Sequence, residues 1–171
     1  ILLCGGPGTG RHFTLTETAR CMAARGLLKS DRLAVMDLAL YPGSGAEKLF
    51  LQDLYAALHA PGEIVVFEHY ESCCPGFLKT LADLAVRGSA PLSSRYLVNK
   101  EGMLVDAGTA LAPGAVSRID PCGKYLIFYS HKGREALADK FGAALVSALG
   151  HVCETASYTR EDLAALAAQQ L

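Results

Sequence analysis

The sequence predicts an α/β fold in three layers, with a central, mainly parallel five-stranded sheet between helices. Apolar stretches of strand length alternate with segments of helical periodicity along the 171 residues, and this order is typical of sheets with parallel strands. The first apolar stretch runs into a glycine-rich loop, and helical sequence follows at once. Strand, glycine loop and helix in this order are the context of a phosphate-binding loop.

The glycine-rich loop has the sequence GGPGTG. Glycines let the backbone curl with its N–H groups pointing inward, and the N-terminus of the following helix adds partial positive charge. The spacing of the first and last glycines is that of a Walker A loop, which continues with Lys and then Ser or Thr. An ordinary tight turn is the alternative, because a glycine-rich turn alone is weak evidence. The candidate nucleotide-binding residues are Gly5, Gly6, Pro7, Gly8, Thr9, Gly10, Arg11 and His12.

The other elements follow from hydrophobic periodicity and turn signals. Apolar runs predict strands over 1–3, 32–40, 64–69, 124–130 and 151–155. Helical spacing predicts helices over 13–25, 46–60, 75–88 and 133–149. A hairpin is expected over 95–106 and a surface loop over 108–123. A capping box from Thr159 to Asp162 opens a last helix.

Polar residues stand where two of the apolar runs end. Glu68 and His69 close one run, and His131 follows another. Functional groups of α/β sheets gather at the carboxyl ends of strands. We therefore expect the strands that lead to the glycine loop, to Glu68 and to His131 to be adjacent at the centre of the sheet. These three polar residues are the candidate catalytic positions.

The composition gives no support for nucleic acid or membranes as partners. A net charge of −1 gives no reason to expect nucleic acid or an anionic membrane, and no apolar run approaches the ~20 residues of a membrane helix. The six cysteines form no C-x-x-C pair, so we expect free, buried thiols in a cytoplasmic protein. The chain begins inside a strand without Met, and we expect it to be part of a longer protein.

Several motifs together resemble the AAA+ ATPases, a branch of the P-loop NTPases. Residues 5–10 resemble their Walker A loop, and residues 65–75 resemble the Walker B strand and helix start of the Clp-type unfoldases and disaggregases. Residues 101–106 are similar to the K-G-R-T-V-D hairpin of that group, residues 126–131 to its sensor 1 strand, and residues 141–163 to its F-x-P-E-F-L-N-R stretch. The resemblance implies a large nucleotide-binding subdomain over 1–158 and the first helix of a small lid subdomain over 159–171.

The sequence departs from the family pattern at the positions whose side chains bind magnesium or take part in hydrolysis. The substitutions are Arg11 for the Walker A lysine, His12 for the magnesium-binding hydroxyl, Glu68-His69 for the Walker B pair, His131 for the sensor asparagine and Ala148 for the arginine finger. The stretch between Leu40 and Glu63 contains no aromatic-Val-Gly pore motif. We therefore expect no threading of substrates.

Three functions remain open from the sequence. The resemblance implies ATP or ADP as ligand and other chains or flanking domains as partners in an AAA+-type oligomer. A degenerate module would bind nucleotide with weak or no hydrolysis, because an imidazole at position 12 does not give Mg²⁺ the hard oxygen that it prefers. The alternatives are a genuine weak ATP hydrolase with Glu68 as metal ligand, and an interaction domain with an empty loop.

The histidines raise a separate metal hypothesis. In the family's geometry His12, His69 and His131 surround one pocket with Glu68 between them. Imidazoles and a carboxylate favour zinc or a similar ion over magnesium. The alternative is that the imidazoles are neutral and hydrogen-bonded to the backbone.

Overall fold

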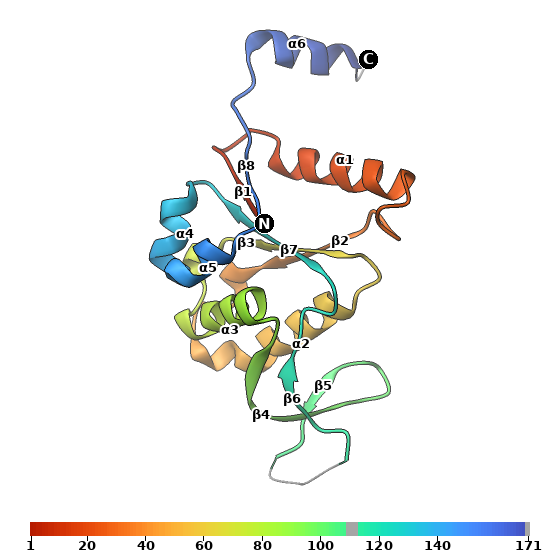
Figure 1. The fold of residues 1–171 in the computed structure, drawn as a ribbon, viewed down its shortest axis with the longest axis vertical. Helices are drawn as coiled ribbons and strands as arrows, with labels where there is room; N and C mark the ends of the chain where they lie inside the picture. The colour runs from red at the N-terminus through yellow and green to blue at the C-terminus, as the bar shows by residue number, and fades with distance from the viewer. Residues whose placement is uncertain (109–112, 170–171) are drawn as a thin grey trace.

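A five-stranded parallel sheet forms the centre of the chain (Figure 1). The computed structural model describes residues 1–108 and 113–169. The strands, in spatial order, are β2 (Leu33–Asp37), β3 (Ile64–Glu68), β7 (Tyr125–Ser130), β1 (Leu2–Cys4) and β8 (Val152–Glu154). Each neighbouring pair is parallel. The predicted sheet is confirmed, and β3, β7 and β1 are adjacent as expected.

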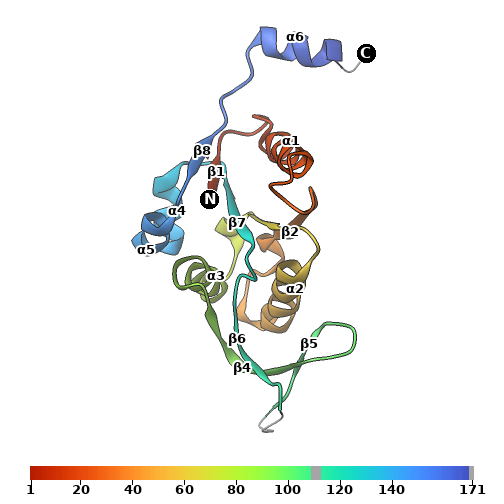
Figure 2. The same ribbon diagram turned by 45° about the vertical axis from the view of Figure 1, so that its right-hand side comes forward.

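Alternating side chains of the sheet bury its two faces under different helices. Leu3, Val66 and Ile127 pack with Leu15 and Ala19 of helix α1 (Arg11–Ala24) on one face. The other face carries the larger core, under α2 (Glu47–His59), α3 (Pro75–Arg87), α4 (Arg134–Phe141) and α5 (Ala143–Ala148). Figure 2 shows α1 and α3 on opposite sides of the strands. The three-layer prediction is confirmed.

Short 3-10 turns connect several of these elements. They are η1 (Leu38–Leu40), η2 (Ser44–Ala46) and η3 (Tyr70–Ser72). The second strand therefore ends at Asp37, three residues before the predicted end, because η1 replaces its last residues.

A second, antiparallel sheet projects from the main body (Figure 1). It contains β4 (Ala90–Val98), β5 (Leu104–Asp106) and β6 (Val116–Ile119) in the order β5-β4-β6. The β4–β5 pair confirms the predicted hairpin. The prediction of a loop over 108–123 is wrong at β6, which pairs with the start of β4. Residues 109–112 lie outside the described part of the chain.

The predicted helix over 133–149 is also corrected. Gly142, with a φ of 83°, lies between α4 and α5 and interrupts the helical hydrogen bonding. Helix α6 (Arg160–Gln169) starts at the expected capping box, in which the Asp162 carboxylate accepts from the Thr159 backbone and the Thr159 hydroxyl accepts from Asp162 N. Figures 1 and 2 show α6 standing apart from the sheet.

All six cysteines are free, as predicted. The expectation that they are buried is wrong for Cys21, Cys122 and Cys153, which are exposed because they lie on outward-facing positions of α1, a turn and an edge strand. Within the described residues, every helix is too short or too polar to cross a lipid bilayer.

Candidate functional site

The glycine-rich loop turns through two left-handed residues before α1 begins. Gly8 and Gly10 have φ values of 72° and 71°, a conformation that costs other residues steric strain. Gly10 is the N-cap of α1, and no side chain caps this helix end. The first N–H groups of a helix have no partner inside it. The loop therefore leads into a helix end whose first N–H groups have no side-chain cap, and such ends are common places for anions to bind.

The loop is fixed to the segment that follows β8. The buried Thr9 hydroxyl donates to Gly6 O at 2.8 Å and lies 2.7 Å from the hydroxyl of Thr155. A Cβ at Gly5 would lie 2.2 Å from the Thr155 hydroxyl oxygen, and one at Gly10 would lie 2.0 Å from the Tyr158 hydroxyl oxygen. Close approach to Thr155, including its backbone oxygen, therefore favours glycine at position 5, and the positive φ favours glycine at position 10.

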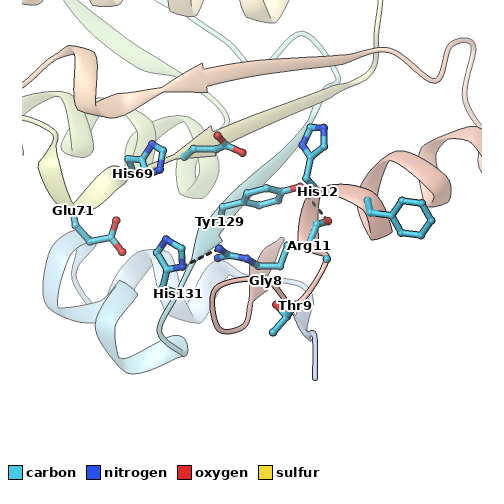
Figure 3. A pocket seen from close by; sticks show the side chains of 11 residues that line it. Gly8, Thr9, Arg11, His12, His69, Glu71, Tyr129 and His131 are labelled. Atoms are coloured by element: carbon cyan, nitrogen blue, oxygen red, sulfur yellow. Dashed lines mark hydrogen bonds between the residues drawn. The ribbon is translucent and has the colours of Figure 1, made fainter. Parts of the chain in front are cut away.

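An open pocket of about 280 Å³ lies between the loop and the carboxyl ends of β3 and β7. Residues 8–13 line one side, and Glu68, His69, Glu71, Tyr129 and His131 line the rest (Figure 3). The structure thus brings the end of the loop together with all three candidate catalytic positions. Residues 5–7 do not line the pocket, since they form the part of the loop that returns to β1.

Arg11, which directly follows the glycine-rich loop, extends along the end of β7. Its Nη1 donates to Ser130 O at 2.5 Å, and its Nη2 lies 2.9 Å from His131 Nδ1 (Figure 3). The guanidinium carbon is 5.6 Å from the centroid of the Tyr129 ring, within the range of a cation–π contact. Arg11 therefore provides positive charge beside the loop while it is bound to the neighbouring strand.

The end of β7 is fixed by two tyrosines that sequence reasoning did not identify. Tyr129 donates its hydroxyl to Arg11 O at 3.3 Å, and burial raises its pKa to about 12. Tyr70, in η3, lies with its hydroxyl oxygen 2.8 Å from that of Ser130, and both side chains are buried. Both tyrosines stay protonated at neutral pH, so they orient their neighbours as neutral groups.

His69 is bound to a carboxylate that sequence reasoning also missed. Its Nδ1 lies 2.8 Å from Asp37 Oδ1. This hydrogen bond is the largest cause of a lowered pKa at Asp37. Asp37 is paired in register with Glu68 at the end of the neighbouring strand. The available signal was its position as the one charged residue inside the apolar run 33–40.

His69 also has an unusual backbone conformation. Its φ is 53° and its ψ is 37°, in the left-handed region, which is uncommon for a residue other than glycine. This conformation ends β3 and starts η3. His69 therefore combines an uncommon backbone conformation with a side chain that is held by Asp37.

The metal hypothesis is wrong for the three-histidine set. Among residues 1–108 and 113–169, no group of three or more His, Cys, Asp or Glu side chains could hold a metal ion. His131 and His69 direct their Nδ1 atoms to Arg11 and Asp37. Figure 3 shows His12 pointing away from both. The three imidazoles line one pocket but do not converge, and those of His69 and His131 bond to side chains rather than to the backbone.

Comparisons with known proteins support the fold. No known protein family matches the sequence, and no curated protein matches it. Among solved structures, the chain is similar to a chain of the S. cerevisiae Hsp104–ADP complex, with a TM-score of 0.59 and 11% identity. The chain has an AAA+ domain fold. The similarity covers 99% of this chain but only 31% of that chain, and at this identity it shows the fold alone.

Proposed function

We propose that this chain is a degenerate Clp-like AAA+ module that binds ATP or ADP, hydrolyses it weakly or not at all, and serves as a structural or regulatory part of a larger protein. One observation carries the proposal: a glycine-rich turn leads into an uncapped helix N-terminus, while the residues around the pocket differ from the usual hydrolytic side chains. The Hsp104 structure that the chain resembles is a complex with ADP, which supports a nucleotide as the ligand.

Phosphate binding depends mainly on the backbone here. The uncapped N-terminus of α1 offers N–H groups and partial positive charge to an anion whatever the side chains are. Arg11 adds a full charge at the same end. Its planar guanidinium does not replace a compact ammonium in detail, but it can pair with a phosphate through its unused N–H groups.

Hydrolysis has less support. Phosphoryl transfer needs bound Mg²⁺ and an oriented water in addition to charge neutralisation. His12 offers a nitrogen in place of the hydroxyl oxygen that Mg²⁺ prefers. His69 is held by Asp37 on one ring nitrogen. In the alternative enzyme function, a weak ATP hydrolase, Glu68, half-buried at the pocket, would hold a metal-bound water.

A second candidate function, an interaction domain with an empty loop, is favoured by one observation. Both terminal nitrogens of Arg11 already have acceptors on or next to β7. In either case we propose that the partners are flanking domains or other chains in an AAA+-type oligomer. We also propose a cytoplasmic location, in keeping with six free cysteines.

Substitutions at His12 test the proposal. His12→Thr restores a hydroxyl at the magnesium position, and His12→Ala is the matched control. We expect Mg²⁺ to raise the affinity for ATP in His12→Thr and to leave it unchanged in the wild type and in His12→Ala. Binding would be measured by isothermal titration calorimetry. Equal Mg²⁺ dependence in all three proteins would contradict the assignment of position 12.

Turnover separates the two nucleotide-binding alternatives. We expect phosphate release from ATP by the wild type to equal that of Glu68→Gln. A wild-type rate well above that of Glu68→Gln, and dependent on Mg²⁺, would establish the weak hydrolase instead. Absence of nucleotide binding at any Mg²⁺ concentration would favour the empty-loop interaction domain.

A further inference from the structure

The contact between Arg11 and His131 fixes where the protons are. A guanidinium has five N–H donors, no acceptor and a permanent charge. His131 Nδ1, which lies 2.9 Å from Arg11 Nη2, must therefore accept the hydrogen bond. The imidazole is then neutral, with its hydrogen on Nε2.

Protonation of His131 turns its attraction to Arg11 into repulsion. A doubly protonated imidazole has no lone pair on Nδ1, and its positive charge repels the guanidinium at the same distance. The remaining attachments of Arg11 are the Ser130 carbonyl and the Tyr129 ring. The Ser130 carbonyl also accepts from Gly5 N, so it does not depend on Arg11 for a partner.

We propose that His131 is a proton-controlled latch on Arg11: neutral His131 holds the guanidinium against the end of β7, and protonated His131 releases it for an oxyanion bound at the glycine-rich loop. The inference rests on the proposed phosphate site and adds its regulation. The ligand class is a phosphate or another divalent oxyanion. Lower pH strengthens binding, because the released guanidinium and the new imidazolium both face the anion.

Other charged or titratable groups face the same region and must be separated from the latch. They are His12 on α1, Asp37 on β2, Glu68 and His69 at the end of β3, Glu71 on η3, Tyr129 on β7, Lys132 after β7, Lys140 on α4 and Glu154 on β8. Two of these groups, His12 and His69, are imidazoles like His131. A wild-type pH dependence alone therefore does not isolate His131.

Two variants of His131 isolate the latch. His131→Asn keeps an acceptor oxygen near the place of Nδ1 but has no titratable group, so Arg11 stays held at every pH. His131→Ala removes the acceptor, so position 131 does not hold Arg11 at any pH and only the Ser130 carbonyl and the Tyr129 ring remain as its contacts. His59→Asn is the matched control, because His59 lies on α2 and does not line the pocket. All four proteins retain His12 and His69.

The measurement is sulfate binding at pH 8 and pH 5.5, followed by chemical shifts of the backbone amides of residues 8–12. Sulfate is used because its charge is constant over this range. We expect the wild type to gain roughly tenfold more affinity on acidification than His131→Asn, the effect of one hydrogen bond to a charged group. At pH 8, His131→Ala should bind more tightly than the wild type. Equal gains in the wild type and His131→Asn, or weaker binding by His131→Ala at pH 8, would overturn the latch.

Different results would refute the latch and the proposed phosphate site. The ¹⁵N shifts of the His131 ring report the tautomer without any ligand. The latch predicts hydrogen on Nε2 and a bare Nδ1 at pH 8, and a mixture of tautomers in Arg11→Ala. Hydrogen on Nδ1 in the wild type would overturn the latch whatever sulfate does. A bare Nδ1 with no sulfate binding at either pH would instead count against the proposed phosphate site.

Discussion

Arg11→Ala tests the contacts of the Arg11 side chain, because their loss lowers the free energy of unfolding whereas relief of the helix dipole raises it. Arg11 is the first residue of α1, where a positive side chain opposes the helix dipole by about 0.3–1 kcal/mol. Its two hydrogen bonds and its contact with the Tyr129 ring act in the other direction. We estimate about 1 kcal/mol for the part-buried bond to Ser130 O, and roughly 0.5 kcal/mol each for the exposed bond and the cation–π contact.

The stabilising contacts outweigh the dipole in this estimate. Arg11→Ala should therefore lower the free energy of unfolding by roughly 1–2 kcal/mol, which is a fall in Tm of about 2–8 °C for a domain of this size. Urea unfolding, followed by circular dichroism, measures the effect. Lys29→Ala is the control, since Lys29 is exposed and lies outside the helix, and it should change stability by less than about 0.5 kcal/mol. A stabilised Arg11→Ala protein would show that Arg11 does not make these contacts in solution.

Two further changes test the fold and the end of β2. Gly62→Ala should lower the free energy of unfolding by about 1–3 kcal/mol, because its Cβ would lie 2.0 Å from Arg32 O. Gly76 lies in α3 with open space around it, so Gly76→Ala should raise the free energy of unfolding by about 0.5–1 kcal/mol. Urea unfolding measures both variants, and a Gly62→Ala protein that is more stable than Gly76→Ala would contradict the backbone positions. The pKa of Asp37 is lowered from 3.8, so its contribution is complete above that unfolded-state value and is lost as pH falls through the folded-state pKa. Asp37→Asn should thus be less stable than the wild type at pH 6 and equally stable near pH 2; a difference that persists at low pH would exclude the His69 pairing as its cause.

The centre of the sheet could be predicted because buried parallel strands leave a strong signal. All four apolar residues of 64–67 are buried, as expected of a strand covered on both faces. Strand β6 left no such signal. Only Ile119 of its four residues is buried, and the strand exists because it pairs with β4, whose partner residues lie 20 to 29 positions earlier. Pairing over such a distance cannot be inferred from local periodicity.

The break between α4 and α5 and the contacts within the site could not be predicted from local sequence either. The apolar spacing on either side of Gly142 fits one helix, and a single glycine is tolerated within helices at a cost of ~1 kcal/mol, so the sequence does not reveal that this residue takes a φ of 83°. The positions of Glu68, His69 and His131 around one pocket followed from strand order. Their partners, Asp37 and Arg11, depended on side-chain directions that residue types and spacing do not determine.

The central claim is that the loop backbone and Arg11 bind a nucleotide without help from magnesium. Calorimetric titration of the wild-type chain with ADP, once in the presence of Mg²⁺ and once with a chelator, tests it most directly. We predict saturable binding with one site and the same affinity, within about twofold, in both titrations, because position 12 offers the metal no hydroxyl oxygen. Absence of binding in both titrations, or binding that disappears when the chelator is added, would contradict the claim.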